Sequence, residues 1–189
     1  MLMRSFAALA GAATLAACSS TPPPYPPISF TDRPAWRVDA PEIVVKDDYS
    51  APMNVPNVEQ EMPIRPADVI HAWVRDRLRA AGTGGTLQVE IRQASVVADP
   101  APRRPDSDKD LKKGTKLTAE LDVDLIFTRP GGTPETTSVQ VSRSTILTKD
   151  LSGADSDKAY YDFTKDLAVD LDKQLQNQAT LHMRDALMS

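Results

Sequence analysis

The chain has 189 residues, and its 22 Lys and Arg side chains against 26 Asp and Glu give a formal net charge of -4 at pH 7. This acidic balance argues against a nucleic-acid-binding protein, whose affinity depends on clustered basic side chains that neutralise phosphates. The single cysteine, Cys18, excludes an intramolecular disulfide and a cysteine-rich zinc or iron–sulfur site.

Residues 1–17 have the pattern of a signal peptide. A basic start at Arg4 precedes an uncharged run, residues 5–17, that is rich in Ala and Leu. As a helix this run would span about 20 Å, whereas a membrane-spanning helix must cross roughly 30 Å of hydrocarbon. We therefore expect a cleaved signal peptide rather than a permanent transmembrane anchor.

The sequence Leu15-Ala16-Ala17-Cys18, at the end of this run, resembles the lipobox of bacterial lipoproteins. The resemblance implies cleavage before Cys18, a diacylglycerol on its sulfur and a further acyl chain, such as palmitate, on its amine. Two or more acyl chains give stable membrane attachment. Ser19, where an Asp would imply the inner membrane, implies the outer membrane facing the periplasm. The alternative is an ordinary secretory peptide with an accidental cysteine near its cleavage site.

Residues 18–34 are predicted to form a tether between the lipidated cysteine and the folded part of the chain. The run TPPPYPP at residues 21–27 favours polyproline II, which is a semi-rigid spacer. A proline-rich ligand for a partner domain is the alternative. Residues 35–185 are then predicted to form a single domain.

This domain begins with a predicted strand at residues 35–45, interrupted or restarted at Pro41 because proline lacks the amide donor that a sheet needs. Residues 46–65 are predicted to be extended and are proline-rich, yet they contain several apolar side chains. Such a long connection is unusual inside a compact domain. It either lies across the domain with its apolar side chains in surface grooves, or forms an arm that binds a partner.

An amphipathic helix is predicted from Pro66 to just before Gly82, since proline favours a first helical turn and glycine a helix end. Its apolar side chains fall on one half of the helical wheel. Arg77 points into this apolar half. We therefore expect its guanidinium either to reach solvent along the packing surface or to pair with a carboxylate.

Three strands are predicted next, at residues 86–97, 116–128 and 136–147. The alternation of apolar and polar residues is clearest in the second, as expected for an antiparallel strand with one buried face. In the first strand the phase slips near Gln93 and Ala94, which predicts a bulge. The charged, proline-containing stretch at 98–114 is expected to be a mobile loop, and the last two strands are expected to form a hairpin.

A long second helix is predicted from Asp155 or Ser156 to about Arg184. The order β-α-β-β-β-α predicts an α+β fold, in which two amphipathic helices pack on one face of a four-stranded, largely antiparallel sheet. This order is similar to that of small periplasm-facing lipoproteins of diderm bacteria, including a lipopolysaccharide-assembly lipoprotein and the auxiliary lipoproteins of lipid ABC transporters. The resemblance implies an accessory or assembly role in the cell envelope.

The sequence shows no catalytic constellation, so we expect neither an enzyme nor a bound cofactor. His71 and His182 lack an HExxH motif or an acidic partner at ligand spacing, and no metal site is predicted. The Gly-Thr-Gly-Gly run at residues 82–85 follows a helix and precedes a strand, the reverse of the order in a phosphate-binding loop. Its expected role is to end the helix and form a tight turn.

An acidic row of Glu120, Asp122 and Asp124 lies on one face of the second of the three strands. Alternate residues on a strand are about 7 Å apart, so the row could hold a calcium ion. The stronger interpretation is a solvated strand face, with Arg92 or Arg143 as a cross-strand partner.

The sheet face opposite the helices is predicted to be polar, which suits protein docking better than enclosing a small ligand. Its candidate partner-binding residues are Glu90, Arg92, Glu120, Asp122 and Asp124. The sequence therefore predicts a non-enzymatic, membrane-anchored accessory subunit that binds an envelope protein.

Two other functions remain open. The chain could carry a lipid or another small ligand in an apolar pocket between the first helix and residues 46–65. It could also be an envelope hydrolase, which a deep pocket lined by His71 or by the Asp122 cluster would support.

Overall fold

The computed structural model describes residues 25–101, 114–147 and 153–188. The predicted signal peptide, the lipobox with Cys18 and most of the predicted loop at residues 98–114 lie outside the described residues. Among the described helices, none combines the length and the apolar character needed to cross a membrane.

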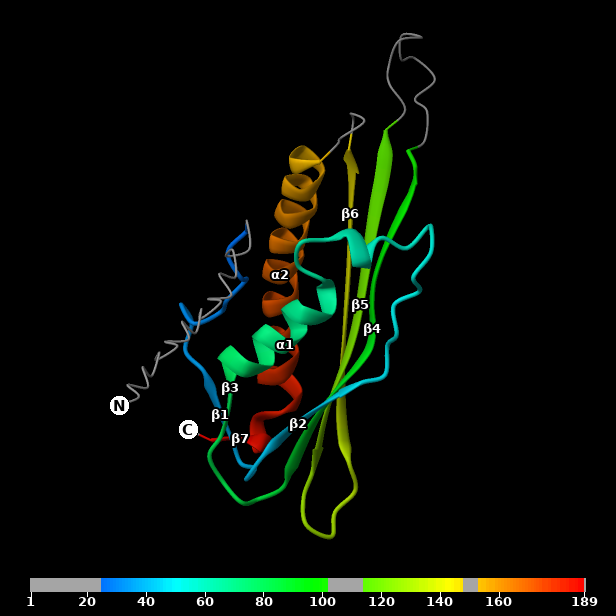
Figure 1. The fold of residues 1–189 in the computed structure, drawn as a ribbon. Helices are drawn as coiled ribbons and strands as arrows, with labels where there is room; N and C mark the ends of the chain where they lie inside the picture. The colour runs from blue at the N-terminus through cyan, green and yellow to red at the C-terminus, as the bar shows by residue number, and fades with distance from the viewer. Residues whose placement is uncertain (1–24, 102–113, 148–152, 189) are drawn as a thin grey trace, which may run out of the picture.

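Four strands form the main sheet, in the order β2-β4-β5-β6 (Figure 1). Their bounds are Ile43–Asp47 for β2, Thr86–Pro100 for β4, Thr115–Thr128 for β5 and Glu135–Leu147 for β6. Strand β2 runs parallel to β4, and the other two neighbouring pairs are antiparallel. The predicted four-stranded, largely antiparallel sheet is confirmed.

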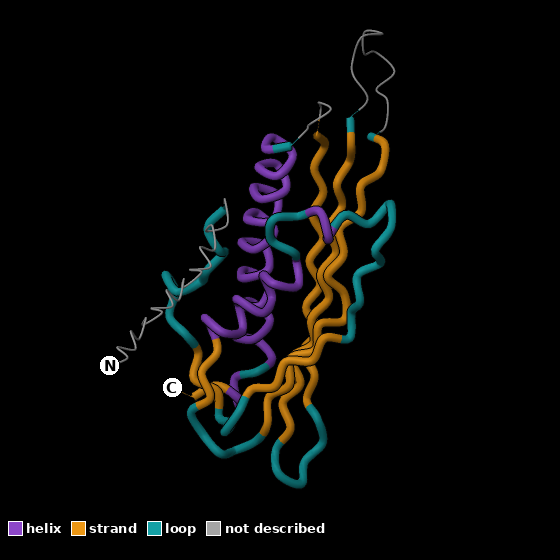
Figure 2. The backbone as a smooth tube through the Cα atoms, in the orientation of Figure 1, coloured by secondary structure: helices purple, strands orange, loops and turns teal. Residues whose placement is uncertain are grey.

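Two helices lie together on one face of this sheet, as Figure 2 shows. Helix α1 spans Pro66–Arg77, and helix α2 spans Ala154–His182. In α2 the buried Phe163, Leu167, Leu171 and Leu175 recur every fourth residue, so they form one apolar stripe. The α+β class and the placement of both helices on one face agree with the prediction.

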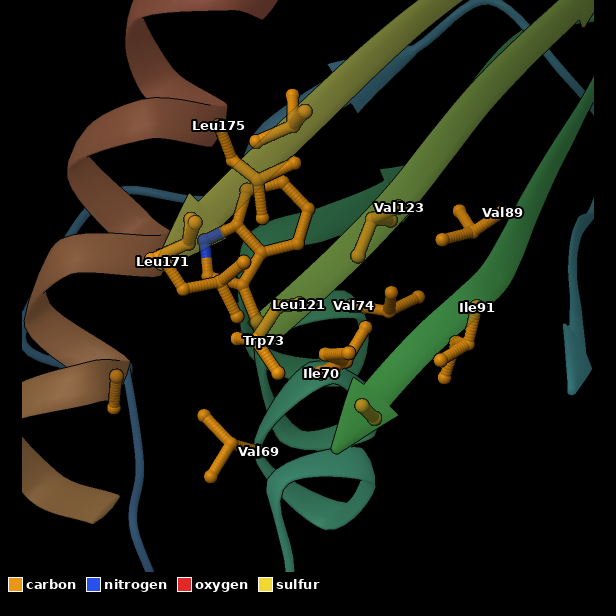
Figure 3. Close-up of a cluster of buried hydrophobic side chains, with 14 of the residues drawn as sticks. Val69, Ile70, Trp73, Val74, Val89, Ile91, Leu121, Val123, Leu171 and Leu175 are labelled. Carbon is orange, nitrogen blue, oxygen red and sulfur yellow. The ribbon is translucent and has the colours of Figure 1, made fainter. Parts of the chain in front are cut away.

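The core lies between these helices and the inner face of the sheet (Figure 3). Trp73 from α1 meets Leu171 and Leu175 from α2, next to Leu121 and Val123 of β5, and all five side chains are buried. Every second residue of β5 from 117 to 127 is buried, which is the alternation that the sequence predicted.

The predicted bulge is present in β4. The register between β4 and β5 shifts between Ile91 and Gln93, so that Arg92 is the extra residue. The shift lets Ala94 and Val96 return to the buried face, where they lie opposite Leu121 and Ala119.

A second, three-stranded sheet was not predicted. Its order is β3-β1-β7, with β1 at Trp36–Val38, β3 at Leu78–Ala80 and β7 at Leu187–Met188. Helix α1 ends at Arg77, and the next three residues pair in parallel with β1. The prediction that this helix continues to just before Gly82 is therefore wrong in its last turn. Strand pairing here overrides a modest helix preference. The expected strand at residues 35–45 is interrupted at Pro41, and its two parts join different sheets.

The polypeptide before β1 packs on the helices, although residues 18–34 were predicted to be a tether. Tyr25 stacks on Tyr161 of α2, with ring centroids 4.8 Å apart. Phe30 is buried, and its backbone amide donates a hydrogen bond of 2.9 Å to Asp76 of α1. The Ser29 hydroxyl donates a second one, of 3.0 Å. Residues 25–34 therefore belong to the folded unit.

We expect Asp76→Asn to destabilise the fold by about 1–2 kcal/mol at pH 7, because it weakens the attachment of Phe30. Burial raises the pKa of the Asp76 carboxyl, but hydrogen bonds from the Phe30 amide, Arg75 and Ser29 outweigh it and leave the pKa below its usual value. The ionised carboxylate thus stabilises the fold above the unfolded pKa of about 3.9, and this stabilisation is lost as the pH falls through the folded pKa.

Urea unfolding at pH 7 and at several values below pH 4 tests this expectation. The difference between Asp76→Asn and wild type should shrink as the pH falls, whereas a difference that stays constant would contradict it. Asp162→Asn, on the exposed face of α2, is the matched control and should change stability by less than about 1 kcal/mol.

A buried ion pair lies where the two helices meet. Asp172 of α2 accepts hydrogen bonds from Trp73 Nε1 (2.9 Å) and from Arg77 Nε (3.1 Å), and Arg33 pairs with its other oxygen. Arg77 and Asp172 are each only 1% exposed. The expectation that Arg77 pairs with a carboxylate is confirmed, and this pair also ties the segment before β1 to both helices.

Candidate functional site

The face of the main sheet that points away from the helices is called the outer sheet face below. It comprises the polar side chains of β4 and β5 that alternate with the buried ones. The five predicted partner-binding residues all lie on it: Glu90, Arg92, Glu120, Asp122 and Asp124. Both helices lie on the opposite side (Figure 2), so within the described residues no helix covers this face.

Glu90 is the centre of a charged network at the β2 side of this face. Its carboxylate accepts hydrogen bonds from Arg92 (3.1 Å), from Gln88 (2.5 Å) and from Lys46 of β2 (3.3 Å). Burial opposes its charge, but the bonds from Arg92 and Lys46 hold the pKa of Glu90 below its usual value. Glu90 is therefore ionised at neutral pH and fixes the position of both cations.

The acidic row is held by polar neighbours on adjacent strands. Asp122 accepts a hydrogen bond of 3.0 Å from Gln140, and Asp124 accepts one of 2.5 Å from Ser138, both on β6. Glu120 accepts one of 3.0 Å from Gln93 of β4. This is a solvated strand face with ordered side chains.

Of the two basic side chains considered as cross-strand partners, Arg92 lies 3.8 Å from Asp124. Arg143 does not take part, so that alternative is wrong. It lies opposite Ala119, whose side chain faces the core, and it therefore reaches Asp166 and Asp170 of α2 on the helix side of the sheet, at 2.6 Å each.

A second site, a cavity of about 200 Å³, lies between α1 and the segment that follows β2. Its polar lining residues are Asp47, Tyr49, Glu59, Arg65, Asp68 and His71. The carrier hypothesis placed a pocket at this position, but it expected apolar walls. The apolar side chains of the segment are used elsewhere: Val58 and Met62 are buried in the core, while Met53 and Val55 are 78% and 80% exposed.

Glu59 lies in a short 3-10 helix, η1 (Glu59–Glu61), and is only 1% exposed. Its Oε1 accepts three hydrogen bonds, from the Tyr49 hydroxyl (2.9 Å), Asn57 Nδ2 (2.9 Å) and the Val96 amide (2.8 Å). Its Oε2 is buried and has no hydrogen-bond partner in the protein. Nothing in the sequence singles out Glu59, because its donors come from three separate parts of the chain.

The other charged groups around the cavity are already paired. Arg65 donates two hydrogen bonds to Asp68, of 2.9 and 3.0 Å, and the His71 ring contacts Asp47 at 3.0 Å. Burial raises the pKa of the Tyr49 hydroxyl above its usual value, and the hydrogen bond to Glu59 raises it further. The hydroxyl therefore keeps its proton and donates a hydrogen bond to Glu59.

The lining contains no serine, threonine or cysteine that a histidine could activate as a nucleophile. In the described ranges, the His, Cys, Asp and Glu side chains also form no group of three or more that could hold a metal ion. The arrangement can bind a ligand through its carboxylates, and His71, which the hydrolase alternative named, lines it as well.

No protein-family model and no curated protein matches the chain. Among solved structures, rare lipoprotein B from Shewanella oneidensis is similar at 10% identity and a TM-score of 0.42, over 75% of this chain and 96% of that one. A minor lipoprotein from Acinetobacter baumannii is similar at 11% identity and a TM-score of 0.32, over 77% of this chain and 92% of that one. A putative neuraminyllactose-binding hemagglutinin homolog from Helicobacter pylori is similar at 10% identity and a TM-score of 0.46, over 86% of this chain and 96% of that one. None of these similarities is close enough to assign a family or a function.

Proposed function

We propose that the protein is a lipid-anchored, non-enzymatic accessory subunit of a cell-envelope complex, facing the periplasm from the outer membrane. Two features support the proposal: the sequence Leu15-Ala16-Ala17-Cys18, which resembles a lipobox, and the outer sheet face. The observation that carries it is the network around Glu90, because it presents fixed charges on a sheet face that no described helix covers.

The charges of this face indicate the chemistry of the partner. Glu90, Glu120, Asp122 and Asp124 outnumber the basic side chains beside them, Lys46 and Arg92. Complementary charge steers association and suppresses wrong partners. The partner is therefore an envelope protein with a basic or donor-rich surface, and hydrogen bonds already hold the acidic side chains in place, which reduces the entropy lost on binding.

Charge reversal on the outer sheet face should weaken docking. We expect Glu120→Lys with Asp122→Lys to lower the yield of partner cross-linked in native membranes by on the order of tenfold, since each reversal replaces an attraction with a repulsion. The matched control is Asp162→Lys with Asp166→Lys, two exposed carboxylates of α2 on the opposite side of the sheet. Affinity purification followed by mass spectrometry measures the yield.

Two results would contradict the docking proposal. One is that wild type cross-links no stoichiometric protein partner. The other is that the control pair lowers the yield as much as the outer-face pair, because the effect would then come from net charge alone.

A second function, the carriage of a small ligand, is favoured by the cavity beside α1. Its carboxylate-rich lining makes a lipid tail a poor occupant and a polar ligand a better one. Native mass spectrometry of the detergent-extracted protein separates the two functions, because a carrier retains a small bound molecule and a docking subunit does not.

A further inference from the structure

We propose that the cavity between α1 and residues 47–65 binds the ammonium group of a small primary amine, with Glu59 as the carboxylate that receives it. This inference gives the ligand class of the small-ligand function and does not depend on the docking proposal. It rests on the position of Glu59, on the charge of the cavity and on its size.

The Glu59 carboxylate has one oxygen that accepts hydrogen bonds from the protein and one that does not. Three donors converge on Oε1, which fixes the carboxylate in place, while the buried Oε2 receives no hydrogen bond from the protein. A buried carboxylate oxygen without a donor is costly, so a ligand that supplies an N–H there gains a charge-assisted hydrogen bond. Glu59 itself lines the cavity, which places that ligand beside it.

The neighbouring cations do not supply this donor. Arg65 is held by Asp68 through two hydrogen bonds, and His71 contacts Asp47. Three carboxylates therefore line the cavity against one arginine and one histidine, so its acidic side chains outnumber its basic ones. This excess of negative charge favours a positively charged ligand.

The geometry fits an organic ammonium better than a metal ion. Calcium takes six to eight oxygen ligands, and the described residues hold no group of three or more His, Cys, Asp or Glu that could bind a metal. An ammonium instead needs a few hydrogen-bond acceptors. The volume of about 200 Å³ restricts the ligand to a small one. Four apolar residues complete the wall and would contact its alkyl part: Ala51, Ala67, Ile91 and Ala94.

The test is a titration of the full-length mature protein, labelled with ¹⁵N and held in detergent, with propylammonium chloride at pH 7. The Val96 amide is the reporter, because it donates to the carboxylate that receives the ligand. We expect a saturable shift of this resonance. Tetramethylammonium chloride, which lacks N–H donors, and propanol, which lacks charge, should leave it unchanged at the same ionic strength.

Glu59→Gln is the decisive variant. It keeps an oxygen for the three donors and removes the negative charge, so binding should weaken by at least about tenfold. Glu61→Gln makes the same change two residues along η1, on an exposed side chain outside the cavity, and should bind like wild type. Ala67→Leu fills the cavity from α1 while keeping the Glu59 carboxylate, and should also abolish binding.

The inference is overturned if propylammonium gives no saturable shift at Val96, or if tetramethylammonium gives the same shift. It is equally overturned if Glu59→Gln or Ala67→Leu binds as tightly as wild type. Failure in these titrations leaves the cross-linking of the outer sheet face unaffected, so the two proposals fail separately.

Discussion

Asp172→Ala is expected to lower the free energy of unfolding by about 3–5 kcal/mol, the usual cost of removing one member of a buried ion pair. The substitution leaves Arg77, which is 1% exposed, without its carboxylate, and it removes the acceptor of the Trp73 indole N–H. It also releases Arg33, which joins the segment before β1 to α2. One change therefore loosens three parts of the chain.

Urea unfolding followed by tryptophan fluorescence measures this loss, because Trp73 donates directly to Asp172 and packs edge-on against Trp36 at 5.5 Å. Asp170→Ala is the matched control. It lies two residues away on α2, where its half-exposed side chain pairs with Arg143, and should cost less than about 1 kcal/mol. An Asp172→Ala loss within 1 kcal/mol of this control would show that the buried pair does not hold the helices together.

Cys18→Ala is expected to abolish lipidation completely. The sulfur of Cys18 is the predicted attachment point of the diacylglycerol, and each buried methylene of an acyl chain contributes about 0.8 kcal/mol to membrane binding. The variant should be uncut by the lipoprotein signal peptidase and should incorporate no radioactive palmitate. Ser19→Ala, the adjacent control, should be cut and labelled normally. Palmitate labelling that persists in Cys18→Ala would contradict the anchor.

Most of the sheet and both helices could be predicted because their signals are local. The alternation from Leu117 to Phe127 and the four-residue spacing from Phe163 to Leu175 each extend over several repeats. The bulge at Arg92 could also be predicted locally, because the alternation of apolar and polar residues changes phase near Gln93 and Ala94. By contrast, β3 and β7 have three and two residues, which is too short for any period. Their formation depends on pairing with β1.

The candidate site could be predicted only in part. The outer sheet face follows from alternation alone, so Glu90 and the acidic row could be placed on one surface. The partner of Arg77 could not be identified, because Asp172 lies 95 residues further along the chain. Glu59 gave no signal for the same reason: Tyr49, Asn57 and Val96 converge on it only after folding. The lipidation of Cys18 stays a prediction.

The packing of residues 25–34 on the helices limits the distance between the folded part of the chain and a membrane anchor at Cys18. If Cys18 carries the anchor, only residues 18–24 separate it from Tyr25, which stacks on α2. Seven residues span at most about 25 Å when fully extended. Tyr25 and the adjoining end of α2 then stay within that radius of the bilayer surface. A partner whose contact surface stands much further out in the periplasm is beyond the reach of this part of the molecule.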